Sequence, residues 1–191
     1  MPNCYLASQS PRRRELLTQI GVDFTLVSVD VPEEKQANET ALDYVERLAF
    51  DKSRAGAECY TDAPVLGSDT IVVLGEQVLE KPQSQEHAVQ MLLALSGQTH
   101  QVMTAVAITL GERTECCYCI SHVSFCDISE QEAIAYWQTG EPKDKAGSYG
   151  IQGLGAVFVK HLQGSYSAVV GLPLYETTQL LRSFNIPIWG K

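Results

Sequence analysis

Short apolar, strand-like runs alternate with amphipathic helical patterns along this chain, and this alternation limits its fold class more than any other feature. Strand-like runs occur at CYLAS, DFTLVSVDV and VLGSDTIVVL, and helical spacing of apolar residues separates them, as at Leu42, Val45, Leu48 and Ala49. The run HQVMTAVAITLGERTECCYCISHVSFCDI alternates like two paired antiparallel strands. Elements interleaved in this way predict an α/β fold with a mixed twisted sheet and flanking helices.

Local signals place the expected helices and the extent of the domain. Pro11 fits the first turn of a helix in PRRRELLTQIGV, Gly21 ends it, and Ser129 can cap a helix in SEQEAIAYWQTG. Two strand-like runs flank a turn at Gly75. With 191 residues the chain is long enough for one domain, and we expect a single domain of two lobes over residues 1–191.

Charge and hydropathy exclude several classes of function. The net charge is -9, which disfavours nucleic-acid and membrane-surface binding, because both need an extended basic face. The longest apolar runs fall short of the ~20 residues of a membrane span, and the first residues lack the pattern of a secretion signal. We therefore expect a cytoplasmic protein that binds any anion locally.

Three consecutive arginines, Arg12 to Arg14, stand at the start of the first expected helix. The amino end of a helix carries about half a positive charge, so arginines there are disfavoured unless an anion is present. A phosphate or polyphosphate would satisfy the helix N–H groups and the guanidinium groups together, and Ser8 adds a hydroxyl donor. Because neighbouring helical side chains diverge by about 100°, we assign Arg12 and Arg13 to the anion and Arg14 to the surface. The alternative is that all three arginines are solvated.

Asp69 interrupts an apolar, β-branched run and follows Gly67, which favours a general base or a metal ligand at a strand end. The alternative for Asp69 is a turn residue that accepts local N–H groups. Lys81 precedes Pro82, which holds it extended, and it suits phosphate binding beside Glu80. Its alternative is an ordinary exposed lysine.

Gln152 lies within the glycine-rich segment DKAGSYGIQGLG, where glycines permit close backbone approach to a ligand. Its amide can donate and accept hydrogen bonds, as recognition of a nucleobase requires. The alternative is a flexible series of turns.

Four of the six cysteines, Cys116, Cys117, Cys119 and Cys126, crowd into ECCYCISHVSFC. Their spacing is not that of a known zinc motif, but His122 lies close by, so a zinc site is the alternative. We interpret them as small residues on a buried strand in a reducing compartment.

Several of these segments together resemble one family. LASQSPRRRELL, GSDTIVVL, LEKP, LSGQTHQVMTAV and DKAGSYGIQGLG followed by VVGLPL look like the Maf family of nucleoside triphosphate pyrophosphatases, in the expected order over almost the whole chain. The likeness is greatest to its dTTP/UTP pyrophosphatase subgroup. Gln9 and Ser68 depart from the family pattern, but neither change removes a charged group.

The resemblance implies a two-lobed α/β fold around a cleft, related to the inosine triphosphate pyrophosphatases. It implies cleavage of dTTP and UTP between the α and β phosphates, with a housecleaning role against non-standard nucleotides. It also implies a divalent cation, Mg²⁺ or Mn²⁺, and a homodimer. Two alternatives remain open, namely a pyrophosphatase for 7-methyl-GTP or other modified nucleotides, and a nucleotide-binding regulator of septum formation.

The resemblance also assigns roles to individual residues. The expected catalytic residues are Asp69 as proton acceptor, Lys81 and Arg13. The expected substrate-binding residues are Ser8, Arg12, Lys52, Thr70 and Gln152, of which Arg12, Thr70 and Gln152 are associated with substrate choice. Glu33 and Asp69 are the expected metal ligands.

Overall fold

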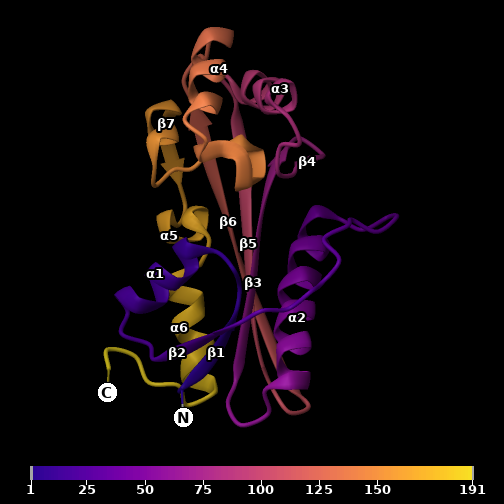
Figure 1. The fold of residues 1–191 in the computed structure, drawn as a ribbon, viewed down its shortest axis with the longest axis vertical. Coiled ribbons are helices and arrows are strands. Elements are labelled where there is room, and N and C mark those ends of the chain that lie inside the picture. The colour runs from indigo at the N-terminus through magenta and orange to yellow at the C-terminus, as the bar shows by residue number, and fades with distance from the viewer. Residues whose placement is uncertain (1, 191) are drawn as a thin grey trace. The chain divides into compact units, whose positions relative to one another are not determined.

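The computed structural model describes residues 2–190 and contains a seven-stranded sheet in the order β2-β1-β3-β5-β6-β7, with β4 paired to β3 (Figure 1). The strands are β1 (Cys4–Ala7), β2 (Phe24–Val27), β3 (Val65–Leu74), β4 (Gln77–Leu79), β5 (Thr99–Leu110), β6 (Arg113–Phe125) and β7 (Val159–Gln163). β1 pairs in parallel with β2 and β3, whereas the pairs β3–β4 and β6–β7 are antiparallel. The predicted mixed sheet is confirmed.

Helices flank the sheet as expected, and hydrogen-bonding caps fix several of their starts. They are α1 (Pro11–Gln19), α2 (Ala41–Cys59), α3 (Gln85–Leu95), α4 (Glu130–Gln138), α5 (Tyr166–Val170) and α6 (Leu174–Ser183), with 3₁₀ turns η1 (Glu141–Asp144), η2 (Ala146–Ser148) and η3 (Leu154–Phe158). Ser129 and Glu132 form a capping box on α4, which confirms the predicted cap, and Thr40 and Asp43 form another on α2. Within the described residues, no helix is both long and apolar enough to cross a bilayer.

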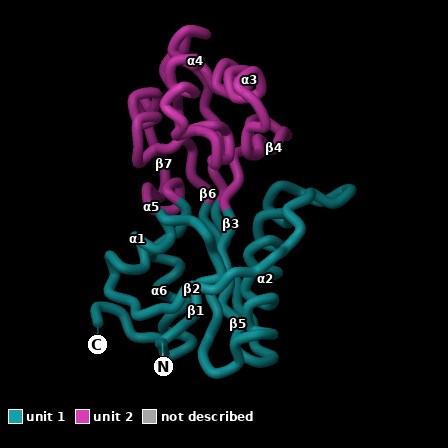
Figure 2. Tube along the Cα trace, viewed as in Figure 1, with its two compact units in different colours: residues 1–69, 104–119, 171–191 teal, residues 70–103, 120–170 magenta. Residues whose placement is uncertain are grey.

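The described chain divides into two compact units (Figure 2). The first contains residues 1–69, 104–119 and 171–191, and the second contains residues 70–103 and 120–170. Tyr5, Ala7, Val27, Ala63 and Val65 form an apolar cluster in the first unit. A larger cluster in the second unit includes Leu92, Leu95, Val123, Phe125 and Phe158. The single domain over residues 1–191 and the cleft between its lobes stay predictions.

Two segments differ locally from the expected elements. The strand expected over DFTLVSVDV ends at Val27, although Val29 still packs against the apolar cluster of the first unit. The strand expected around AVFVKHL begins at Val159, because the preceding residues form η3. Both segments are apolar, and apolar character alone does not determine whether a segment finds a pairing partner.

The interpretation of the cysteine cluster as part of a buried strand is wrong. Cys116 is exposed, and Cys117 and Cys119 are partly exposed, because the first half of β6 consists of exposed and half-buried positions. Cys126, which follows the end of β6, is also partly exposed. The zinc alternative also finds no support: among residues 2–190 no group of three His, Cys, Asp or Glu side chains is placed to hold a metal ion.

Candidate active site

The start of α1 brings one arginine into the interior of the first unit. Arg13 is buried, with 9% of its surface exposed. Its Nε donates to the carbonyl oxygen of Gly171 at 2.8 Å, and its Nη1 donates to Oγ of Ser8 at 3.2 Å. Burial lowers the pKa of Arg13, while the nearby Asp69 carboxylate opposes that change. Arg13 is therefore a buried cation with an acidic residue nearby, and its role in the site stays a prediction.

The other two arginines differ in exposure, in agreement with the divergence of helical side chains. Arg12 is half-buried and Arg14 is exposed. The first turn of α1 contains no acidic side chain, and the N-cap residue Ser10 makes no side-chain capping bond. The amino end of this helix thus keeps the positive character that suits an anion. The solvated alternative is right for Arg14 and wrong for Arg13.

Close packing of β3 against α2 determines where Asp69 points. A Cβ atom at Gly67 would lie 2.5 Å from both the carbonyl oxygen of Ala49 and the backbone nitrogen of Ser53. Only glycine therefore allows the strand backbone this close to the helix. Because side chains alternate along a strand, Asp69 lies on the same face as Gly67 and projects toward α2, which carries Lys52.

Lys52 links two carboxylates from segments far apart in the sequence. Its Nζ donates to Oδ1 of Asp69 at 2.6 Å and to Oε1 of Glu33 at 2.6 Å. The exposed fractions of the Lys52 and Asp69 side chains are 11% and 12%, whereas that of Glu33 is 43%. Three predicted site residues thus form one cluster, with a buried centre and one side open to solvent.

This cluster fits a hard divalent cation. Mg²⁺ is bound in proteins by oxygen atoms, usually one or two carboxylates together with substrate phosphates and water. Glu33 and Asp69 supply two carboxylates that already converge on one positive charge, the Lys52 ammonium. Since the described residues offer no third His, Cys, Asp or Glu at this point, the remaining ligands would come from phosphate and water.

The opposite face of β3 contacts the segment around Gly171. Ser68 points away from α2, and its Oγ donates to the carbonyl oxygen of Gly171 at 3.3 Å. Arg13 donates to the same oxygen. Sequence reasoning missed Gly171, because a backbone carbonyl leaves no signature in the side-chain pattern.

The remaining predicted residues belong to the second unit. Thr70 is half-buried on β3, Lys81 is exposed just after β4, and Gln152 is exposed in the loop before η3. Their assigned roles in substrate binding and catalysis stay predictions.

The glycines around Gln152 approach an internal anion. The Glu141 carboxylate accepts from Tyr136 Oη at 2.7 Å and from the backbone N–H groups of Leu154 at 2.8 Å and Gly155 at 3.0 Å. A Cβ at Gly153 would overlap Oε2 of Glu141. Burial alone would raise the pKa of Glu141, but these hydrogen bonds outweigh it and lower the pKa. The loop that carries Gln152 is therefore built around a carboxylate that sequence reasoning did not single out.

The chain is similar to known proteins of one family. A family model described as "Maf-like protein" matches residues 3–184. The dTTP/UTP pyrophosphatase of Saccharophagus degradans is 59% identical over 189 residues, covering 97% of this chain and 90% of the relative. Proteins of the same name from Pseudoalteromonas translucida and Escherichia coli O157:H7 are 56% and 54% identical, covering 94% and 97% of this chain and 96% and 94% of the relatives.

Among solved structures, protein VC0702 from Vibrio cholerae aligns with 68% of this chain and 65% of its own, at a TM-score of 0.36 and 11% identity. That likeness is too weak to carry an argument. The family model spans nearly the whole sequence, and the relatives are similar over nearly all of theirs. The chain therefore belongs to the Maf-like protein family.

Proposed function

We propose that this protein is a nucleoside triphosphate pyrophosphatase that hydrolyses dTTP and UTP to the monophosphate and pyrophosphate. Relatives at 54–59% identity carry the name dTTP/UTP pyrophosphatase. The observation that carries the proposal is the bridge from Lys52 to Asp69 and Glu33 in the unit that also buries Arg13. A triphosphate requires cations that neutralise its oxygens, and the attacking water requires a carboxylate that accepts its proton.

In this proposal the cationic side chains of the first unit hold the triphosphate. Arg12 and Arg13 bind phosphate oxygens at the start of α1, where helix N–H groups add to the positive potential. The contacts of Arg13 with Gly171 and Ser8 fix its guanidinium before substrate binds, so little side-chain entropy is lost on binding. Lys52 reaches the same substrate from α2, and Lys81 adds a further positive charge.

Asp69 accepts the proton of the attacking water. The water oxygen forms a bond to the α phosphorus as the bond from that phosphorus to the α,β-bridging oxygen breaks, and pyrophosphate leaves with the bonding electrons. Lys52 occupies Oδ1 of Asp69, so we assign proton acceptance to Oδ2. The contact with Lys52 also fixes the orientation of the Asp69 carboxylate.

Glu33 and Asp69 would hold the divalent cation. When bound, Mg²⁺ or Mn²⁺ neutralises charge on the phosphate oxygens during the reaction. Thr70 and Gln152 are proposed to recognise the base, since a side-chain amide can pair with the O4 and N3 edge of thymine or uracil.

A pyrophosphate-release assay over canonical and modified nucleoside triphosphates, with and without Mg²⁺, tests this function. We expect dTTP and UTP to be cleaved fastest and each to require the cation. If 7-methyl-GTP or another modified nucleotide were cleaved much faster than both, the proposed substrate class would be wrong. If no triphosphate were cleaved, the proposed reaction would be wrong.

A further inference from the structure

The segment that carries Glu33 has almost no apolar anchor of its own. Residues 28–36 form neither helix nor strand, and the side chains of residues 32–38 are all exposed. Before the exposed residues 32–38, Val29 packs against the apolar cluster of the first unit. After them, the capping box of Thr40 begins α2. Between these two points, polar contacts must fix the backbone.

One face of α2 supplies those contacts. Tyr44 and Arg47 are three residues apart, so they project from the same side of the helix. Tyr44 Oη donates to the carbonyl oxygen of Glu33 at 2.9 Å, and Arg47 Nη2 donates to the carbonyl oxygen of Glu34 at 3.0 Å. Two consecutive backbone carbonyls, the first belonging to Glu33 itself, are therefore held by α2.

The Arg47 guanidinium also holds the far end of the segment. It donates through Nε and Nη2 to the two oxygens of Glu39, at 2.6 and 3.0 Å, and through Nη1 to Asp51 at 3.3 Å. Bidentate pairs of this kind are the most directional that a side chain can form. A single side chain thus joins residue 34, residue 39 and the helix.

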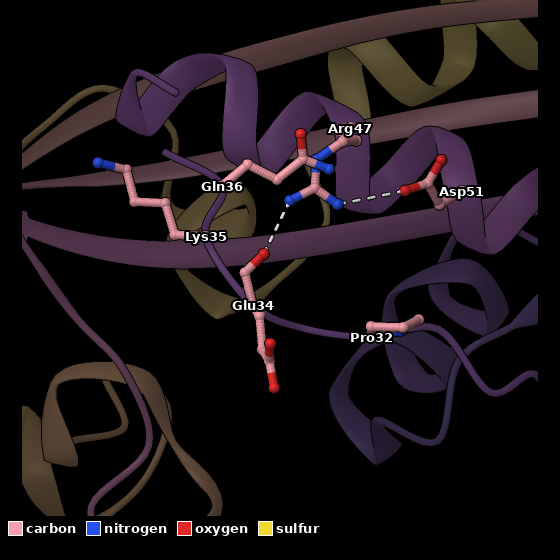
Figure 3. Close-up of a pocket in the computed structure, with 6 residues that line it drawn as sticks. All are labelled: Pro32, Glu34, Lys35, Gln36, Arg47 and Asp51. Atoms are coloured by element: carbon pink, nitrogen blue, oxygen red, sulfur yellow. Dashed lines mark hydrogen bonds and ion pairs between the residues drawn. The ribbon is translucent and has the colours of Figure 1, made fainter. Parts of the chain in front are cut away.

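A hollow lies beside this contact. Its volume is about 420 Å³, and its lining consists of Pro32, Glu34, Lys35, Gln36, Arg47 and Asp51. Figure 3 shows the Arg47 guanidinium between the Glu34 carbonyl group and the Asp51 carboxylate, with Lys35 extending away from it. The donor groups of Arg47 are used within the protein, so we do not interpret the hollow as a ligand site.

We propose that Arg47 is a positioning residue that places Glu33 for the divalent cation, and this inference rests on the proposed function. Arg47 fixes the Glu33–Glu34 backbone from one side, while Lys52 fixes the Glu33 carboxylate from the other. Loss of a residue that orients a metal ligand typically costs about 10- to 100-fold in metal affinity or activity. The effect of Arg47 should appear in the requirement for metal more than in the chemical step.

The test compares Arg47→Ala and Arg47→Lys with wild type. We expect Arg47→Ala to raise the half-saturating Mg²⁺ concentration about 10-fold or more, with kcat largely restored at saturating Mg²⁺. Arg47→Lys keeps the charge but loses the bidentate geometry, so its half-saturating Mg²⁺ concentration should lie between those of wild type and Arg47→Ala. Binding of Mn²⁺ alone, followed by the electron paramagnetic resonance signal of the free ion, should weaken in the same order.

Arg113→Ala is the matched control. Arg113 lies in the same unit, donates to Glu115 through two nitrogens and covers the ring of Phe184, but it does not contact the Glu33 segment. Hydrogen exchange of the metal-free protein should accelerate over residues 33–39 in Arg47→Ala and stay unchanged there in Arg113→Ala. Tyr44→Phe, which removes one hydroxyl, provides a milder second variant with the same expected direction.

A double variant distinguishes positioning from a general loss of stability. If Arg47 acts through Glu33, adding Arg47→Ala to Glu33→Ala raises the metal requirement no further. An unchanged Mg²⁺ requirement in Arg47→Ala, or full additivity with Glu33→Ala, would overturn the inference. Failure of wild type to cleave any triphosphate would overturn the proposed function instead, while the exchange and Mn²⁺ measurements would still test the role of Arg47.

Discussion

Lys52 is the residue on which the charge balance of the site depends. It is buried between two carboxylates that would otherwise repel each other, since both contact its ammonium at 2.6 Å. From the sequence it looks like an ordinary lysine of an amphipathic helix, and only the family resemblance singled it out. Its burial results from the close approach of β3 to α2.

The substitution Asp69→Asn tests the assignment of Asp69 as the general base. Asparagine keeps the shape of the side chain but cannot accept a proton, so we expect kcat to fall by about 10²- to 10⁴-fold. Binding of a non-hydrolysable dTTP analogue, measured by calorimetry, should change much less. Equal turnover of dTTP by the variant and wild type would refute the role of Asp69.

The three arginines at the start of α1 allow an internal comparison. Arg13 is buried and Arg14 is exposed, so equal losses of charge should have unequal effects. We expect Arg13→Ala to raise KM and lower kcat, with kcat/KM reduced about 10²-fold or more, and Arg14→Ala to leave both nearly unchanged. Steady-state kinetics with dTTP checks this, and similar values for the two variants would show that Arg13 has no role in substrate binding or catalysis.

At the scale of elements, Gly67 couples the packing of β3 and α2 to the site. We expect Gly67→Ala to destabilise the protein by about 1–3 kcal/mol, because its Cβ would overlap the helix backbone. The strand would also move away from α2, separating Lys52 from Asp69 and lowering activity. Urea unfolding and dTTP hydrolysis measure the two effects.

Ser68→Ala is the control for that variant. Ser68 is the next residue on the same strand, but it faces the opposite side and forms one long hydrogen bond, at 3.3 Å. Its loss should cost about 1 kcal/mol or less and leave activity close to wild type. If Gly67→Ala were as mild as Ser68→Ala, close packing of the strand would not be what positions Asp69.

How far the sequence predicts these elements depends on their length and on their partners. The long segments α2, β5 and β6 are recognisable because many residues report the same period. The helix α5, of five residues, is too short for any period to emerge. Arg47 and Glu141 could not be found from the pattern, because each contacts backbone groups of a segment 13 residues away in the sequence.

The site is predictable where a residue conflicts with its surroundings. Arginines at the start of a helix and an aspartate in a β-branched run both conflict with local preference, and the structure brings Arg13 and Asp69 into one unit. Glu33 lies in an exposed polar segment where a glutamate is an ordinary residue. Its expected role as a metal ligand therefore came from the resemblance.

For the molecule as a whole, a buried histidine predicts acid sensitivity. His100 lies in the second unit with 1% of its surface exposed, and its Nε2 lies 2.7 Å from Tyr149 Oη. Burial lowers its pKa to about 4, from an ordinary value of 6.5. Between these values the unfolded chain binds the proton and the folded chain does not, so stability falls as the pH drops from about 6.5 toward 4.

That difference in pKa corresponds to a loss of about 3 kcal/mol over this range. Urea unfolding of wild type and His100→Phe at pH 7 and at pH 4.5 measures it. The variant should be less stable at pH 7, because Tyr149 loses its hydrogen-bond partner, but its stability should fall less on acidification. An equal fall in both proteins would show that other groups cause the acid sensitivity.

In the proposed reaction, water attacks the α phosphorus at a site built by Asp69, Glu33 and Lys52. Hydrolysis of dTTP with Mg²⁺ in water labelled with oxygen-18, followed by mass spectrometry of the products, tests it most directly. We expect the label in dTMP and not in pyrophosphate, and a strongly reduced rate in Asp69→Asn. Label in pyrophosphate, or release of orthophosphate in place of pyrophosphate, would contradict it.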